Sequence, residues 1–202
     1  MGSFISTLVF QPPSVTYKRA KKIIWLKSKD GVDIPVLYID KKSNTTILFS
    51  HGNAEDLGMI YEWLVTLAYE FRVRYCLVCN IRYVICVITM CIFQVNILAY
   101  DYTGYGKAKG TPNEESCYRN IEAAYAHLTE TLLHPPENII LYVLLFAGIV
   151  GCYVLLCHVF NLFVIDRSFG RSLGTGPSTY LAHQLSEQGV RIGGLVLQVC
   201  PS

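Results

Sequence analysis

Short apolar runs alternate with helix-type segments along the 202 residues, and this order constrains the fold more than any other feature. The runs at 45–50 and 96–100 are almost wholly apolar, which is typical of strands buried on both faces. The segments at 55–71 and 114–133 repeat apolar residues at helical spacing. Strands alternating with helices build parallel sheets. We therefore expect an α/β fold, with a mostly parallel, doubly wound sheet and helices on both faces.

The remaining elements fit the same order. We expect further strands at 23–27, 34–39, 139–142 and 192–199, and a helix that ends near 188. Asp30-Gly31 marks the turn between the first two strands. Pro135-Pro136 ends the helix that precedes the strand at 139–142.

Two apolar segments, 73–94 and 143–169, interrupt this pattern. They explain why the chain is 52% hydrophobic and only 16% charged, against about a quarter charged in ordinary proteins. The second segment, taken with 139–142, is long enough to span a bilayer at about 20 residues. Six of the eight cysteines lie in these segments: Cys76, Cys79, Cys86, Cys91, Cys152 and Cys157. Clustering in apolar runs argues against a disulfide framework.

The composition also excludes several classes of function. The 17 Lys and Arg residues against 15 Asp and Glu give a net charge of +2 without a long basic block, so we expect no nucleic-acid partner. Cys76 and Cys79 form a lone C-x-x-C without a second ligand pair at zinc spacing. We expect neither a metal nor a cofactor.

The N-terminus carries a candidate acylation signal. Met1-Gly2 with Ser6 fits the M-G-x-x-x-[ST] myristoylation pattern at Gly2. A basic cluster follows, made up of Lys18, Arg19, Lys21 and Lys22. An acyl chain and a polybasic patch together anchor a protein stably. We expect 1–16 to be a membrane-anchoring segment; the alternative for the cluster is a solvated strand end.

A G-x-S-x-G pentapeptide at 170–174 carries the candidate chemistry. In a nucleophile elbow, the serine occupies a tight strand-to-helix turn, which here would expose Ser172 Oγ above the sheet. Gly170 and Gly174 flank it because side chains there would collide with neighbouring elements. The N–H of Leu173 would point at a developing oxyanion. The alternative is a glycine-rich turn without chemistry.

A second loop supports the elbow interpretation. His51-Gly52-Asn53-Ala54 follows the strand at 45–50, where Asn53 or Ala54 would supply the second oxyanion donor. We interpret His51 and Gly52 as structural residues of this loop. Asp101, which follows the strand at 96–100, is interpreted as a loop-bracing carboxylate and not as a triad acid.

Four motifs in sequence order carry a family resemblance: HGNAEDLG at 51–58, NILAYDYTGYG at 96–106, PPENIILY at 135–142 and GRSLGTGPS at 170–178. They resemble the α/β-hydrolase-domain protein depalmitoylases and their relatives among serine-aminopeptidase-like hydrolases. The resemblance covers nearly everything except the two apolar segments. It implies an α/β-hydrolase fold, a nucleophile at Ser172, and thioester cleavage that removes palmitate from S-acylated membrane proteins. That group is attached to membranes by an acylated N-terminus, although its N-terminal cysteine cluster is absent here.

The chain departs from this family after the elbow. The triad order Ser, Asp or Glu, His has no counterpart, because no Asp follows Ser172 and His183 lies eleven positions along the same helix, with Glu187 one turn further. A rise of about 1.5 Å per residue carries His183 about 16 Å away. We therefore expect 17–202 to be an incomplete α/β-hydrolase domain, without the C-terminal strands and inactive as it stands.

The apolar segments are the second departure. Removing 73–94 and 143–169 joins EFR to VNILAY and NIILY to GRSLG, which restores the family pattern. We interpret both segments as translated introns or gene-model errors, and the second would put the elbow out of register with its strand. The alternative is a transmembrane helix at 139–165.

The resulting hypothesis is a serine hydrolase, a palmitoyl-protein thioesterase by lineage, at the cytoplasmic face of the plasma membrane or endomembranes. Two alternatives stay open. One is a non-catalytic, membrane-associated fragment that binds or scaffolds. The other is a general esterase, lipase or peptidase of the same fold.

Overall fold

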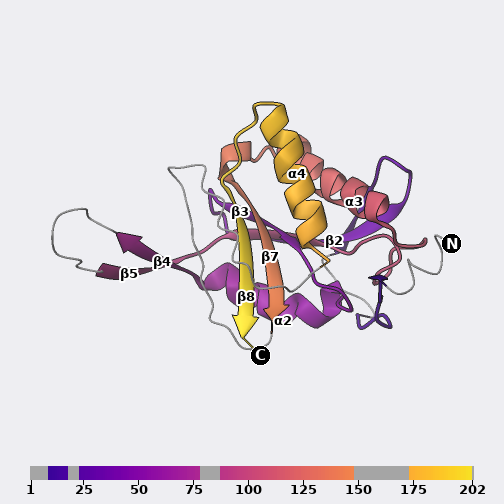
Figure 1. Cartoon of the computed structure of the whole chain (residues 1–202), viewed down its shortest axis with the longest axis horizontal. Helices are drawn as coiled ribbons and strands as arrows, with labels where there is room; N and C mark the ends of the chain where they lie inside the picture. Colours follow the sequence, from indigo (N-terminus) through magenta and orange to yellow (C-terminus); the bar gives the residue numbers. More distant parts are fainter. Residues whose placement is uncertain (1–8, 18–22, 78–86, 148–172, 202) are drawn as a thin grey trace.

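The strands and helices alternate as expected in the computed structural model, which describes residues 9–17, 23–77, 87–147 and 173–201 (Figure 1). The elements in chain order are β1 (Ile23–Lys27), β2 (Asp33–Ile39), β3 (Thr46–Ser50), α2 (Leu57–Tyr69), β4 (Phe71–Leu77), β5 (Val87–Phe93), β6 (Asn96–Tyr100), α3 (Glu114–Ala126), η1 (His127–Thr131), η2 (Pro136–Asn138), β7 (Ile139–Ala147), α4 (Thr175–Glu187) and β8 (Gly194–Pro201).

Six strands form one sheet in the order β1-β2-β6-β3-β7-β8. The strands β6, β3, β7 and β8 run parallel, whereas β1 and β2 join antiparallel at one edge. Every residue of β3 and β6 is buried, which explains the unbroken apolar runs in the sequence. The expected α/β class, with a mostly parallel sheet, is confirmed.

Helices cover both faces of this sheet. One face packs against α2, where Leu64 and Ala68 meet Phe49 and Ile47 of the central strand β3. The other face carries α3 and α4 (Figure 1), and its core includes Leu48, Ile121 and Leu181. Alternate residues of β3 therefore enter opposite cores, as the strand period of two requires.

Local caps fix where the helices begin. The Asp56 side chain accepts a hydrogen bond from Met59 N at 3.0 Å and caps α2. Asn113 and Ser116 form a capping box at the start of α3, with Asn113 Oδ1 accepting from Ser116 N at 2.8 Å. Each cap satisfies N–H groups that a first helical turn leaves without intrahelical acceptors.

The helix expected at 114–133 changes its geometry before it ends. The α-helical part of 114–133 stops at Ala126, and His127–Thr131 continues as a π-helical turn closed by Leu132 N to His127 O at 3.0 Å. Leu133 then takes φ +57°, and Pro135 follows. Proline cannot continue the helical hydrogen bonding, so the chain leaves the helix here.

The strand expected at 139–142 is longer than the sequence pattern indicated. β7 continues to Ala147 because β3 pairs with it as far as Val143 and β8 pairs with it from Ile140 to Ala147. The alternative prediction of a transmembrane helix at 139–165 is therefore wrong for residues 139–147, whose backbone is hydrogen-bonded into the sheet. Residues 148–165 of the proposed span lie outside the described residues.

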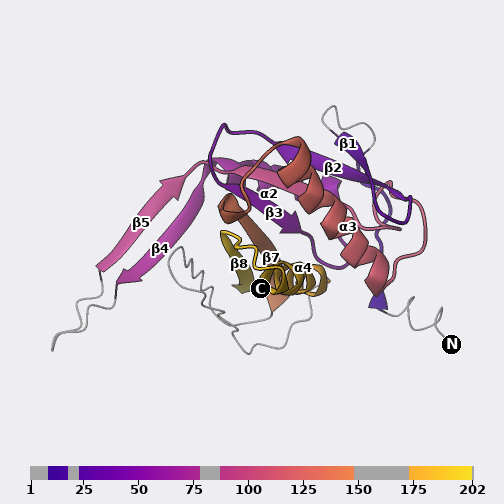
Figure 2. The same cartoon turned by 90° about the horizontal axis from the view of Figure 1, so that it is seen from above.

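The first apolar segment forms strands of its own. β4 and β5 pair antiparallel, from Phe71↔Phe93 to Leu77↔Val87, as a two-stranded ribbon separate from the main sheet. Figure 2 shows this ribbon projecting away from the sheet and its helices. No helix in the described ranges combines the length and apolar character needed to cross a membrane.

The central strand offers a test of this packing. Leu48 is fully buried in β3, whereas Leu133 is 75% exposed. We expect Leu48→Ala to lower the free energy of unfolding by about 2–5 kcal/mol, because it leaves a cavity between the sheet and α3. The matched variant Leu133→Ala should change it by less than about 0.5 kcal/mol. Urea denaturation of the three proteins measures both, and equal losses would contradict this placement of the core.

Candidate active site

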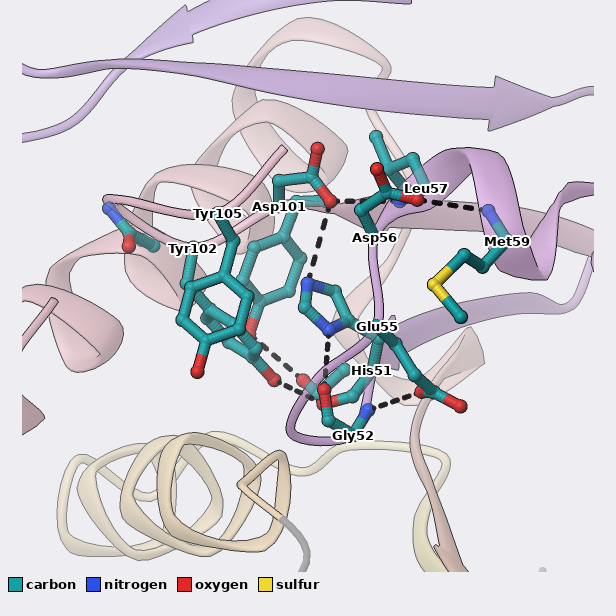
Figure 3. A network of polar contacts seen from close by, with 12 residues as sticks. His51, Gly52, Glu55, Asp56, Leu57, Met59, Asp101, Tyr102 and Tyr105 are labelled. Atoms are coloured by element: carbon teal, nitrogen blue, oxygen red, sulfur yellow. Dashed lines mark hydrogen bonds and ion pairs between the residues drawn. The ribbon is translucent and has the colours of Figure 1, made fainter. Parts of the chain in front are cut away.

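The candidate site lies where the parallel strands β3 and β6 end. Their last residues, Ser50 and Tyr100, are register partners, so the loops that follow leave the sheet at the same edge. The loop His51–Asp56 leads from β3 into α2, and Asp101 begins the loop after β6. Figure 3 shows both loops and their polar contacts. In open α/β sheets, this carboxyl edge is where ligand sites form.

His51 is fully buried beneath these loops. Its Nδ1 lies 2.8 Å from the carbonyl oxygen of Gly52, and its Nε2 lies 3.5 Å from Asp101 Oδ1. Tyr102 packs against the imidazole ring, with ring centroids 4.4 Å apart, and its hydroxyl donates to the His51 carbonyl at 2.8 Å. Both ring nitrogens therefore face groups of the protein interior (Figure 3).

Asp101 connects the start of α2 to the N-terminal segment. Its Oδ1 accepts from Leu57 N at 2.9 Å, and its Oδ2 accepts from the Tyr17 hydroxyl. Gly106, at φ +51°, allows this arrangement, because a Cβ there would overlap the Asp101 carboxylate and lie 2.7 Å from the Tyr17 hydroxyl oxygen. A residue larger than glycine would separate these partners.

Burial shifts the pKa values of His51 and Asp101. It lowers the pKa of His51 from 6.5 to about 4, since the interior disfavours imidazolium. It raises the pKa of Asp101 from 3.8 to about 7 against the opposing effect of its hydrogen bonds from Tyr17 and Leu57. His51 is therefore neutral at neutral pH, and its Nε2, 3.5 Å from Asp101 Oδ1, forms neither an ion pair nor a hydrogen bond with the described residues.

Further contacts shape the loop around Gly52. Glu55 Oε2 accepts from Gly52 N at 2.7 Å, and burial raises the pKa of this carboxyl. Ala54 takes the left-handed conformation with φ +60°, which is unfavourable for an L-residue. Its N–H donates to Asn53 Oδ1 at 3.1 Å, so the Asn53 side chain is hydrogen-bonded to the backbone of this turn.

The second half of the G-x-S-x-G motif packs directly onto this edge. A Cβ on Gly174 would lie 2.5 Å from the carbonyl oxygen of Ser50 and 3.0 Å from that of His51. Leu173, half-buried, packs against the core that underlies α3 and α4. The start of α4 therefore touches the end of β3, and only glycine permits this approach.

A chain of three buried hydroxyls secures the same junction. Ser178 Oγ in α4 donates to Ser50 Oγ at 3.1 Å, and Ser50 Oγ lies 2.9 Å from the Tyr100 hydroxyl. These bonds tie the first turn of α4 to the ends of β3 and β6. No sequence pattern indicated these roles, although Ser50, Tyr100 and Ser178 lie beside or within the four motifs.

The structure brings part of the predicted site together. His51, Gly52, Asn53, Ala54, Asp101, Leu173 and Gly174 meet at the carboxyl edge. Ser172 and Gly170 lie outside the described residues, as do Gly2 and the basic cluster, so their roles stay predictions. Tyr17, Tyr102 and Tyr105 were missed; the available signal for the last two was the tyrosine-rich YDYTGY sequence at 100–105.

Two further histidines, His134 and His183, lie away from this edge. His134 Nε2 is 2.9 Å from the Tyr38 hydroxyl, and its Nδ1 is 3.4 Å from Thr46, the first residue of β3. It therefore belongs to the opposite edge of the sheet. His183 is exposed on α4 and pairs with Glu187 at 3.7 Å. Nine residues separate it from Gly174, which is about 13 Å of helix.

Comparisons with known proteins agree with this architecture. No protein family model matches the chain. It is similar to human alpha/beta hydrolase domain-containing protein 17B, at 28% identity over 170 residues, which covers 70% of this chain and 51% of that protein. It is also similar to protein 17C of Xenopus tropicalis, at 37% over 100 residues (50% of this chain, 25% of that protein), and to protein aho-3 of Caenorhabditis elegans, at 37% over 100 residues (50% and 24%).

A solved structure shows the same fold. The alpha-beta hydrolase from Vibrio vulnificus superposes with a TM-score of 0.50 at 15% identity, covering 86% of this chain and 43% of that one. The chain spans about half the length of the first relative and about a quarter of the other two. Fold and sequence similarity together identify an α/β-hydrolase-type chain that resembles the domain-containing 17 proteins.

The two buried titratable groups predict an unusual pH dependence. The contribution of Asp101 to the free energy of unfolding is complete below its ordinary pKa of 3.8. It is lost as the pH rises through its pKa in the folded chain, about 7. The contribution of His51 is complete above pH 6.5 and is lost as the pH falls towards about 4. Between pH 4 and 6.5 the two slopes offset each other.

We expect Asp101→Asn to remove only the first of these slopes. The free energy of unfolding of the variant, relative to the unmodified chain, should therefore rise with pH between 4.5 and 6.5, by up to about 1.4 kcal/mol per pH unit. Urea midpoints at three pH values measure the slope. Asp33→Asn, at an exposed residue that pairs with Lys27, is the control. Parallel pH profiles for Asp101→Asn and the unmodified chain would contradict the assignment.

Proposed function

We propose that this α/β-hydrolase-type chain carries the nucleophile and oxyanion loop of a serine hydrolase. The observation that carries the proposal is the packing of Gly174 onto the carbonyl oxygens of Ser50 and His51. This contact sets the last residue of the G-x-S-x-G motif beside the His51–Ala54 loop. A nucleophile and an oxyanion donor have to be neighbours in this way for acyl transfer.

The proposed chemistry is acyl transfer through Ser172. The Ser172 oxygen attacks the carbonyl carbon of the substrate while its proton passes to a base. The tetrahedral oxyanion accepts hydrogen bonds from Leu173 N–H and from the His51–Ala54 loop. Collapse breaks the carbon–sulfur bond of a thioester and releases the protonated thiol. Water then hydrolyses the acyl-serine and releases the fatty acid.

We assign the loop donor to the N–H of Asn53. The N–H of Ala54 already donates to Asn53 Oδ1 at 3.1 Å. The N–H of Gly52 donates to Glu55 Oε2 at 2.7 Å. In the part of the chain that the structure describes, no acceptor is paired with Asn53 N–H. Of the two donors that the sequence left open, Asn53 is therefore the better candidate.

The substrate class rests on the resemblance of four motifs to protein depalmitoylases. We propose palmitoyl thioesters of S-acylated membrane proteins as substrates. The named relatives support a hydrolase in general. A thioester suits a serine nucleophile, because the thiolate is a good leaving group. Esters and amides are the competing substrate classes.

The histidines of the described ranges favour a second candidate function. His51 is buried with both ring nitrogens directed inward, and His134 and His183 lie away from the edge. None of these three histidines therefore offers an outward-facing ring nitrogen at this edge that could act as the base. A chain without this base would lose several orders of magnitude in rate. A non-catalytic, membrane-associated hydrolase-like protein is therefore the alternative to turnover by these 202 residues.

A fluorophosphonate probe tests the nucleophile. We expect slow labelling at Ser172, lost in Ser172→Ala and at least about tenfold slower in Gly174→Ala, because a displaced elbow loses part of its oxyanion stabilisation. Gly176→Ala is the matched control, since a Cβ there meets nothing closer than Tyr118 at 4.0 Å. Mass spectrometry of labelled peptides measures each rate.

The same proteins should not turn over a palmitoyl-thioester peptide above the Ser172→Ala background. Turnover that Ser172→Ala abolishes would show that a base is present after all and would exclude the non-catalytic alternative. Absence of probe labelling at Ser172 in the unmodified chain would exclude the hydrolase proposal.

Membrane attachment is proposed at Gly2, with the basic cluster Lys18, Arg19, Lys21 and Lys22 as the second signal. We expect a myristate analogue to label the chain in cells, and Gly2→Ala to abolish both the label and most membrane partitioning. Ser3→Ala, next to the acceptor, is the control. Unchanged partitioning of Gly2→Ala would contradict the acyl anchor.

A further inference from the structure

The N-terminal segment 9–17, here called the strap, contacts both loops of the candidate site. At one end it meets the side chain of Asn53, and at the other it meets the carboxylates of Asp56 and Asp101. These partners are 40 or more residues away in the sequence. None of the four motifs that carry the family resemblance includes the strap.

The first end of the strap bonds to the candidate oxyanion loop. The N–H of Gln11 is shared between Asn53 Oδ1 at 3.0 Å and the Tyr105 hydroxyl oxygen at 3.1 Å. In return, Asn53 Nδ2 donates to the carbonyl oxygen of Val9 at 2.7 Å. The amide of Asn53 therefore pairs with the strap through both its donor and its acceptor.

Tyr105 completes this arrangement from the loop after β6. Its side chain is fully buried, and its hydroxyl donates to Asn53 Oδ1 at 2.6 Å. The same oxygen accepts the N–H of Ala54, whose φ of +60° requires support from its surroundings. The Asn53 side chain is thus the point at which the strap, the loop after β6 and the oxyanion loop are joined.

The second end of the strap is fixed to α2. Thr16 N donates to Asp56 Oδ2 at 2.8 Å, and the Tyr17 hydroxyl donates to Asp101. Gly58 allows this close approach, because a Cβ there would lie 2.9 Å from Tyr17 Cβ. Asp56 and Asp101 are themselves buried, so this end has little freedom to move.

The sequence between the two ends is stiff. Pro12 and Pro13 have restricted φ angles, and a residue before proline, here Gln11, is held in an extended conformation. Two of the four residues between Gln11 and Thr16 are therefore restricted, which limits where the Gln11 N–H can lie relative to the anchorage at Thr16 and Tyr17.

We propose that the strap is a positioning element that orients the candidate oxyanion donor through the Asn53 side chain. This inference rests on the proposed function at Ser172. The Asn53 side chain and its N–H share one residue, so the bonds from Gln11 and Tyr105 restrict the direction in which that N–H points. Loss of these bonds should weaken oxyanion stabilisation without displacing Ser172 or the elbow glycines.

A pair of variants at Gln11 tests the proposal in the full chain. Gln11→Pro deletes the N–H that bonds Asn53 and Tyr105, whereas Gln11→Ala keeps it and removes only the side chain. We expect Gln11→Pro to slow fluorophosphonate labelling of Ser172 by about fivefold, the effect of one lost hydrogen bond. Gln11→Ala should label at the unmodified rate.

Tyr105→Phe gives a second, independent variant that leaves the strap backbone intact. It removes the hydroxyl that bonds Asn53, and we expect a similar loss of labelling rate. Tyr61→Phe on α2 is its matched control, at a half-buried tyrosine outside the site. Melting temperatures of all four variants exclude general unfolding as the cause of slower labelling.

Deuterium uptake by the peptide that contains Gly52–Glu55 separates failure of this proposal from failure of the proposed function. We expect faster uptake there in Gln11→Pro and Tyr105→Phe than in their controls. Equal labelling rates for Gln11→Pro and Gln11→Ala would overturn the positioning role. If Ser172 is not labelled even in the unmodified chain, the proposed function fails. In that case, deuterium uptake by the Gly52–Glu55 peptide is the remaining test of the positioning role. Equal uptake in the two Gln11 variants would overturn it.

Discussion

The buried carboxylate of Asp101 is the contact on which the candidate site depends. It bonds two segments that are distant in sequence, the strap through Tyr17 and the start of α2 through Leu57, and it lies 3.5 Å from His51 Nε2 in the loop after β3. Burial raises its pKa to about 7, so the folded chain retains a proton that the free side chain would lose. An unpaired buried carboxylate is costly, and each of these contacts therefore stabilises the arrangement of the others.

Parallel strands explain why these segments meet. β3 and β6 run in the same direction and end in register at Ser50 and Tyr100, so the loops after them share one edge. Glycines then permit approaches that side chains would prevent: Gly106 against Asp101, and Gly174 against the carbonyl oxygen of Ser50. These close approaches hold the loops at the end of the sheet, which suits a function that needs fixed N–H donors.

The apolar segments are accommodated in two different ways. The β4–β5 ribbon lies outside the main sheet, where lengthening a connection costs little closure entropy, about 0.6 kcal/mol for each doubling. The second segment instead supplies the last five residues of β7, which extend a central strand beside β8. The strand that leads towards the G-x-S-x-G motif is consequently longer than the motif pattern alone would require.

The sequence by itself determined the class of fold, the order of its elements and most of their bounds, because burial on both faces leaves unbroken apolar runs such as those of β3 and β6. It also identified Gly174 and the His51–Ala54 loop, since close approach and tight turns restrict residue type locally. The length of β7, the separate β4–β5 ribbon and the contacts of Tyr17 and Tyr105 were decided only by the tertiary structure. Hydrogen bonds between residues 40 to 94 positions apart leave no periodic signal in a sequence, since the partners become neighbours only when the sheet is formed.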